Sequence, residues 1–317
     1  MNRRDFALSV LAAALAPAAF AQTGVVKLVL PNAAGSGVDA ITRALGPAVS
    51  KALNAPVVIE NQPGAGGIVG LQTLARSAPD GMTLSVVSNN VVILPSVMKS
   101  MPFDMPGDFT PIAVVGYTPV VLVVNPKVPA KDAKEFVALL KSRNGDMTFA
   151  SGGNGTILHL ASEMFLDEAK AKARHIPYKG VGPMVTDLIG GQVQFGTTAL
   201  PSVQGQLKSG TLRAIGMATS NRVAAAPEIP TFVEQGLPGY VVEAWFAVIG
   251  PKGMAAADVK RVHDAVVAAF ADPGVKEAMA KQGNVINVST SDYARDFFKS
   301  ELAKYAAIVK KAGIEPQ

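Results

Sequence analysis

Small and polar residues gather in three short loops, each placed where a predicted strand leads into a predicted helix. The first loop is residues 31–37 (PNAAGSG), the second is 61–67 (NQPGAGG) and the third is 151–156 (SGGNGT). An apolar run precedes each loop, and apolar residues at helical spacing follow it. Because the first N–H groups of a helix lack intrahelical partners and the helix dipole favours negative charge, such loops are suited to bind an anion.

Each loop also has a simpler interpretation. Glycine-rich turns are common for steric reasons alone, Ser36 and Asp39 match a helix capping box, and Thr156 suits a helix N-cap. Two loops of one design in consecutive strand–helix units favour anion binding over either loop taken singly. At this point the three polar side chains stay open between a capping role and ligand contact.

The second loop is not a nucleotide-binding fingerprint. Gly64 and Gly66 begin a GxGxxG pattern, but Val69 occupies the position of the third glycine, and no GxxxxGK[ST] sequence occurs in the chain. Dinucleotides and nucleoside triphosphates are therefore disfavoured, and no cofactor is expected.

The sequence gives little support for a metal site or for covalent catalysis. The chain has no cysteine, and its three histidines are scattered without an HExxH pair. His159 and Glu163 share a helical face, but a hydrogen bond at the helix end is the better interpretation, and no metal site is expected. No GxSxG elbow occurs, and no histidine lies near Ser151 in sequence, although distant residues can assemble a triad.

The N-terminus matches an export signal. Two arginines at 3–4 precede an apolar segment at 6–16, and an A-x-A site ends at Ala21, so residues 1–21 are expected to be removed. The RRDF sequence suits the twin-arginine route, although Ala7 departs from that motif, and the general secretory route is the alternative. We therefore expect the protein in the periplasm.

The net charge and the hydropathy pattern limit the kinds of partner that the protein is expected to bind. Loss of the leader, with two arginines and one aspartate, changes the formal net charge from +5 to +4. A weakly basic chain without Lys/Arg runs does not indicate nucleic-acid binding, but it mildly favours anionic ligands. No other stretch has the roughly 18 uninterrupted apolar residues that a membrane-spanning helix needs.

Strands and helices alternate along most of the chain, which predicts an α/β fold with parallel sheets. Beyond the loops above, strands are expected at 84–87, 112–115, 120–124, 174–177 and 193–197, and a mostly helical region at 255–314. The length allows two domains.

The loop motifs belong to an ordered set that resembles the substrate-binding proteins of tripartite tricarboxylate transporters, the Bug or TctC-like receptors. The set consists of P-x-x-x-G-S-x-x-D at 31–39, NQPGAGG at 61–67, APDG at 78–81, SGGNGT at 151–156 with His159 after it, PYKG at 177–180, GGQV at 190–193, LPS at 200–202, GLPGY at 236–240 and AWF at 244–246. Any single motif is weak, whereas their order over nearly the whole chain is specific.

The resemblance implies a two-lobed periplasmic-binding-protein architecture of type II, the Venus flytrap, with a central ligand cleft. We place lobe one at residues 22–124 plus 250–317 and lobe two at 125–249. The second boundary rests partly on the resemblance, since composition alone shows no linker there.

The function implied is that of an extracytoplasmic receptor, not an enzyme, that delivers a small organic carboxylate to a large and a small membrane transporter subunit. A monomer is expected. The candidate ligand contacts are Asn32, Ala34, Gly35, Ser36, Gly37, Asp39, Ala65, Gly66, Gly67, Asn89, Ser151, Asn154, Thr156, His159, Tyr178 and Thr198. The alternatives are a periplasmic enzyme acting on a small carboxylate and a sensory receptor for a membrane kinase.

Two departures from the resembling family concern the ligand. Thr197, Thr198 and Ala199 stand where the family often has an acidic residue, which in its amino-acid receptors suits the ammonium group. Their neutral side chains argue against an amino-acid ligand. The first loop also has Asn32-Ala33-Ala34 where Phe-Pro-Pro is more common.

Overall fold

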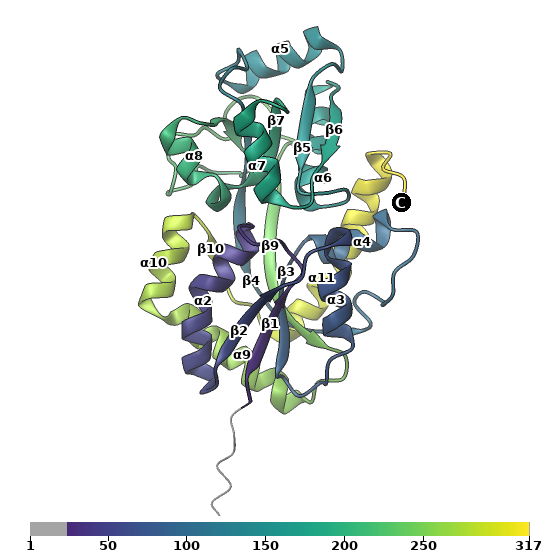
Figure 1. Cartoon of the computed structure of the whole chain (residues 1–317), viewed down its shortest axis with the longest axis vertical. Helices are drawn as coiled ribbons and strands as arrows, with labels where there is room; N and C mark the ends of the chain where they lie inside the picture. The colour runs from purple at the N-terminus through teal and green to yellow at the C-terminus, as the bar shows by residue number, and fades with distance from the viewer. Residues whose placement is uncertain (1–23, 317) are drawn as a thin grey trace, which may run out of the picture.

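The structure, a computed structural model, describes residues 24–316, so the expected leader at 1–21 lies outside the described residues. Ten strands form one connected sheet in the order β2-β1-β3-β9-β4-β7-β5-β6, and β8 and β10 pair with β4 at the side of this path. Figure 1 shows the elements gathered into two lobes, with β4 and β9 running along the centre of the molecule. The α/β fold with two lobes is confirmed.

The lower lobe in Figure 1 is built from the N-terminal strand–helix units and the C-terminal helices. Its elements are β1 (Val26–Leu30), α2 (Gly37–Leu53), β2 (Val57–Asn61), a 3₁₀ turn η1 (Ala65–Gly67), α3 (Ile68–Ala75), β3 (Thr83–Ser88), α4 (Asn90–Val97), β9 (Glu243–Pro251), α9 (Ala256–Ala271), α10 (Pro273–Gln282), β10 (Val285–Ile286) and α11 (Ser291–Lys311). β1 pairs in parallel with β2 and β3, as the alternating pattern predicts.

The upper lobe repeats the strand–helix design. Its elements are α5 (Ala133–Arg143), β5 (Thr148–Ser151), α6 (Ile157–Ala169), β6 (Arg174–Pro177), α7 (Val181–Gly190), β7 (Phe195–Ala199), η2 (Leu200–Ser202), α8 (Gln204–Ser209) and β8 (Arg213–Met217). β5 pairs in parallel with β6 and β7.

The strand β4 (Phe109–Val124) joins the two lobes. Up to Pro119 it pairs antiparallel with β9, and from Val120 it pairs antiparallel with β7 and β8. The two strands expected at 112–115 and 120–124 are therefore one strand, and the sheet is mixed instead of wholly parallel. The change of partner lies five residues before the boundary expected at 124/125, whereas the exact limits of the lobes stay a prediction.

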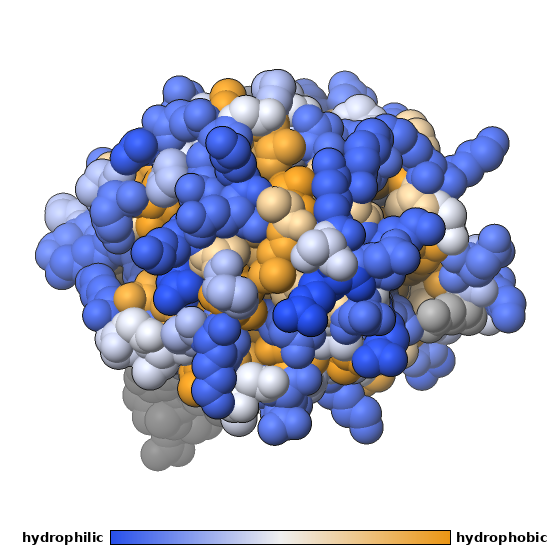
Figure 2. All heavy atoms as spheres, turned by 90° about the horizontal axis from the view of Figure 1, so that it is seen from above, coloured by the Kyte–Doolittle hydropathy of each residue, from blue (hydrophilic) through white to orange (hydrophobic). Residues whose placement is uncertain are grey.

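Apolar residues on both sides of this sheet form the core. The first cluster follows β4 into the upper lobe, where Phe136, Phe149, Phe165 and Phe195 are fully buried. The second cluster packs α2, α9 and α10 onto the lower strands. Seen from above, the surface is mostly hydrophilic, with hydrophobic atoms visible only in the gaps between polar side chains (Figure 2). No helix among residues 24–316 is long and apolar enough to cross a membrane.

Candidate functional site

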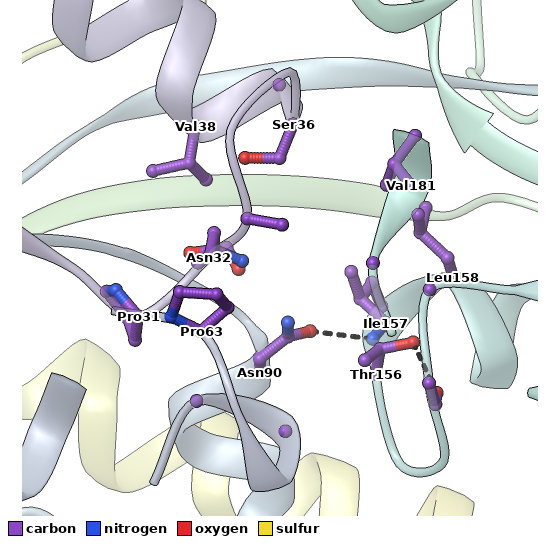
Figure 3. A pocket seen from close by; sticks show the side chains of 18 of the residues that line it. Pro31, Asn32, Ser36, Val38, Pro63, Asn90, Thr156, Ile157, Leu158 and Val181 are labelled. Carbon is purple, nitrogen blue, oxygen red and sulfur yellow. Dashed lines mark hydrogen bonds between the residues drawn. The ribbon is translucent and has the colours of Figure 1, made fainter. Parts of the chain in front are cut away.

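A cavity of about 470 Å³ lies where the loops of the two lobes face one another. The lower lobe contributes the loops before α2 and α3 and the ends of β3 and β9, and the upper lobe contributes the loops before α6 and α7. Figure 3 shows Pro31, Asn32 and Pro63 on one side of this space and Ile157, Leu158 and Val181 on the other. A volume of this size is in the range of small-molecule sites.

The cavity is surrounded by helix N-termini. The first residues of α2, α4, α6 and α7 line it, as does the glycine turn that leads into α3. Each N-terminus carries a partial positive charge and N–H groups that its own helix does not use. No aspartate or glutamate is among the described residues that line the cavity. The wall is therefore suited to a negatively charged ligand.

In the lower lobe several backbone donors have no protein acceptor. The N–H groups of Gly37 and Val38, at the start of α2, and those of Ala65 and Gly66 make no hydrogen bond within the described chain. Gly66 has φ of 70°, a conformation that glycine adopts readily and that shapes the turn. These four residues form the lower-lobe cradle.

Half of the expected site residues line the cavity. They are Asn32, Ser36, Gly37, Ala65, Gly66, Gly67, Thr156 and Tyr178. The other half do not line it in this structure: Ala34, Gly35, Asp39, Asn89, Ser151, Asn154, His159 and Thr198. Several of the second group are buried behind the wall and position it.

Asp39 holds the first two loops together. Its carboxylate accepts hydrogen bonds from Arg43 Nε, Gly35 N and Asn61 Nδ2, each at 3.0 Å to the nearer oxygen. Burial alone would raise the pKa of this carboxyl group, but the hydrogen bonds from Arg43, Gly35 and Asn61 outweigh it, so the pKa lies below its ordinary value. The Asp39 carboxylate therefore makes its hydrogen bonds within the protein.

The two hydroxyl groups that sequence left open between capping and ligand contact do cap helices. Ser36 Oγ accepts from Asp39 N at 3.2 Å at the start of α2. Thr156 Oγ1 accepts from His159 N at 3.3 Å and donates to Gly153 O at 2.8 Å, as Figure 3 shows in part. Both side chains also line the cavity, so capping and ligand contact are compatible for them.

A serine and a histidine distant in sequence do come together in the upper lobe. Ser151 Oγ lies 2.6 Å from His175 Nε2, and the ring of His159 stacks on His175 with centroids 3.9 Å apart. Burial first, and then the neighbouring His159, lower the pKa of His175 to about 3. Ser151 is fully buried, also bonds the backbone of Gly153, and does not line the cavity. This pair is therefore badly placed to act on a molecule in the cavity.

Tyr178 and Asn89 use their polar groups within the protein. The Tyr178 hydroxyl donates to Asp187 Oδ2 at 2.7 Å, and burial together with this bond raises the pKa of Tyr178 to about 12. Asn89 is fully buried and donates to Glu243 O and to the Tyr305 hydroxyl.

Sequence analysis missed several wall residues: Ser88, Asn90, Thr118, Lys179, Val181, Ala199 and Phe246. Asn90, the first residue of α4, follows the predicted Asn89, and Ala199 follows the predicted Thr198 on β7. Since neighbouring residues of a strand face opposite sides, a shift by one position on β7 exchanges a wall residue for one behind it. Lys179 lies inside the PYKG motif, and this motif was the one feature of the sequence that pointed to a wall residue there.

Among the described residues no group of three or more His, Asp or Glu side chains is arranged to hold a metal ion. His159 Nδ1 accepts from Gly155 N at 3.2 Å, and its Nε2 lies 3.5 Å from Glu163 Oε1. The helix-end hydrogen bond expected for this histidine is therefore present.

Comparisons with a sequence family, with a related protein and with solved structures all indicate the same family. The family described as tripartite tricarboxylate transporter family receptor matches residues 41–314. Protein BugT of Bordetella pertussis is 35% identical over 290 residues, which is 91% of this chain and 89% of BugT. The structure of the periplasmic binding protein BugD superposes with a TM-score of 0.87 at 30% identity, covering 92% of this chain and 99% of BugD. The structure of R. palustris Rpa4515 with adipate superposes with a TM-score of 0.88 at 26% identity, covering 92% and 98%.

Proposed function

Because this chain belongs to the tripartite tricarboxylate transporter receptor family, we propose that it is a periplasmic receptor for a small organic carboxylate. It delivers this ligand to the large and small membrane subunits of a transporter and works as a monomer. The expected leader at 1–21 provides export by the twin-arginine or the general secretory route.

The observation that carries the proposal is the set of helix N-termini around one cavity whose described lining holds no carboxylate. Uncommitted N–H groups of Gly37, Val38, Ala65 and Gly66 supply several donors to one anion. Each hydrogen bond to a charged group contributes about 1.5–3 kcal/mol, so a few of them suffice for binding in the micromolar range after ordering costs.

The roles of the site residues follow from their positions. Asn32, Ser36, Gly37, Ala65, Gly66, Gly67 and Thr156 contact the ligand, and Tyr178 forms part of the wall. The remaining expected residues do not line the cavity: Asp39, Asn89, Ser151, His159 and Thr198 are buried and act from behind the wall, whereas Ala34, Gly35 and Asn154 are exposed. The lobes, at 22–124 plus 250–317 and at 125–249, close on the ligand by bending about the segments that join them.

The absence of a described carboxylate from the lining also bears on amino acids. A buried ammonium group without a partner costs several kcal/mol, and hydroxyl groups carry no compensating charge. We therefore expect carboxylates without an amine to bind in preference to aspartate and glutamate.

Native mass spectrometry of the purified protein, followed by a thermal-shift panel, tests this function. A co-purified carboxylate and a higher melting temperature with carboxylates are expected, since a ligand at about a hundred times Kd stabilises by about 2.7 kcal/mol. Stabilisation by amino acids alone would show that the ligand class is wrong. Turnover of the bound ligand would favour the enzyme alternative, for which Ser151 and His175 are the nearest candidates.

A further inference from the structure

The two lobes offer very different hydrogen-bonding groups to the cavity. In the lower-lobe cradle the N–H groups of Gly37, Val38, Ala65 and Gly66 have no protein acceptor within the described chain. Such a group of donors fits one carboxylate, whose two oxygens accept several hydrogen bonds.

In the upper lobe several of the corresponding backbone donors are already used, whereas Val181 N at the uncapped start of α7 has no acceptor within the described chain. Gly153 N donates to Ser151 Oγ, Gly155 N to His159 Nδ1, and Thr156 N to Gly153 O. The last two donors are also committed: Ile157 N donates to Asn90 Oδ1 at 2.8 Å and Gly180 N to Gly152 O at 3.1 Å. The loops before α6 and α7 thus resemble an anion cradle in sequence, but these five N–H groups already donate to acceptors within the protein.

Apolar side chains cover much of the upper-lobe wall. Ile157, Leu158, Val181 and Ala199 all line the cavity, and Figure 3 shows the first three close together on that side. From the lower lobe, Val38 is placed near Ser36 and adds a further apolar group.

The uncommitted polar side chains of the wall are neutral. Thr118 is 7% exposed and its Oγ1 has no hydrogen-bond partner, and the same holds for the buried Oδ1 of Asn32. Ser88 adds one more hydroxyl. Lys179 is the one charged side chain among the described lining residues, and it is exposed, so it lies in contact with solvent.

We propose that the ligand is a monocarboxylate with an apolar body, which carries no second charged group. This inference rests on the proposed function and narrows it. The carboxylate binds the lower-lobe cradle, and the body packs against Ile157, Leu158 and Val181. A second carboxylate would be placed against these side chains, with only the exposed Lys179 and the start of α7 at Val181 to receive it. Thr118 suits one neutral oxygen on the body.

Hexanoate and adipate give a matched test, because both have six carbons and they differ in the second carboxylate. We expect isothermal titration calorimetry at neutral pH to give a Kd for hexanoate at least tenfold lower than that for adipate. Equal or tighter binding of adipate would overturn the inference and leave the proposed function in place, with the uncapped start of α7 at Val181 as the receiver of the second carboxylate. Failure of hexanoate, benzoate, adipate, malate and citrate alike to bind would remove both.

A charge placed in the apolar wall provides a second test. Val181→Lys should shift the hexanoate-to-adipate affinity ratio by at least tenfold toward adipate, because it places a cation within the apolar wall. Val267→Lys is the matched control, since Val267 is 42% exposed on α9 and does not line the cavity. An unchanged ratio in a folded Val181→Lys protein, checked by its melting temperature, would contradict the proposed orientation of the ligand.

Discussion

Asn90, the first residue of α4 in the lower lobe, accepts a hydrogen bond of 2.8 Å from the backbone N–H of Ile157, the first residue of α6 in the upper lobe (Figure 3). A side chain of one lobe therefore satisfies a helix N-terminus of the other. Nearby, a methyl group added to Gly180 would come within 2.8 Å of the Ala33 side chain. The two lobes are therefore in close contact at two places along the cavity wall.

We predict that Asn90→Ala opens the ligand-free protein. A hydrogen bond of this kind contributes about 1 kcal/mol, so ligand affinity should fall about fivefold if closure is needed for binding. Small-angle X-ray scattering should report a larger radius of gyration for the ligand-free variant. Asn90→Asp is the control, because it keeps an acceptor oxygen at the helix N-terminus and should stay as compact as the parent. Equal scattering from the parent and Asn90→Ala would show that the contact does not hold the lobes together.

The lower-lobe cradle can be tested at Ala65, which lines the cavity and has φ of 46°. Aspartate and asparagine both tolerate this left-handed conformation, so the two substitutions differ mainly in charge. Ala65→Asp should weaken carboxylate binding at least tenfold by repulsion, whereas Ala65→Asn should keep affinity within about threefold. Calorimetry gives both values, and melting temperatures of the free proteins should stay within a few degrees. Equal affinities for the pair would mean that the anion binds elsewhere.

Gly66 is less suitable for this purpose. It has φ of 70°, and an added Cβ would lie 3.0 Å from Leu94 Cδ2. A substitution there would strain the turn as well as change its charge, so a loss of binding would have two causes.

His175 predicts a specific dependence of stability on pH. Burial first, and then His159, lower its pKa from an ordinary 6.5 to about 3 in the folded protein. As the pH falls below about 6.5 the unfolded chain takes up this proton and the folded protein does not, so the free energy of unfolding decreases toward pH 3. His175→Gln removes this titration and keeps an acceptor for Ser151.

Urea unfolding at about pH 7 and about pH 5 measures the effect. The parent should lose more stability between these two values than His175→Gln does. All other ionisable residues are common to both proteins, so the difference reports His175. Equal losses in the two proteins would contradict the assignment of a depressed pKa.

The strand–loop–helix units were predictable because each combines an apolar run, glycines and a helical stripe. The expected strand at 174–177 matches β6, and the one at 84–87 lies within β3 (Thr83–Ser88). The continuity of β4 was not predictable in this way. Pro119 and Gly116 suggest a break, yet β4 continues with irregular pairing to β9 on either side of Val114. Register and bulges depend on the partner strand, which a local pattern does not contain.

The loops of the site were also predictable, whereas the direction of individual side chains was not. Asn89 and Thr198 were expected to contact the ligand, but Asn90 and Ala199 line the cavity in their place. Thr198 pairs with Val121 inside the sheet and is fully buried. Its neighbour faces the opposite side of the strand, so an error of one position is sufficient to reverse the assignment.

Lys179 provides the last prediction. It is the one charged residue among the described cavity lining, it is exposed, and it forms no ion pair among the described residues. An exposed charge at the rim attracts an anion before it docks and contributes little to the final contact energy. Lys179→Gln should therefore lower the association rate two- to threefold at low ionic strength, with a similar loss of affinity. In about 0.5 M salt, where screening acts over a few ångströms, the difference from the parent should disappear.

Lys172→Gln is the control, because it removes an exposed lysine of the same lobe that does not line the cavity. It should change neither the association rate nor the affinity. Stopped-flow mixing with a carboxylate that the parent protein binds gives these association rates. A loss of affinity that is larger than tenfold and insensitive to salt would show that Lys179 pairs directly with the carboxylate, and it would transfer the anion site from the lower-lobe cradle to the loop before α7.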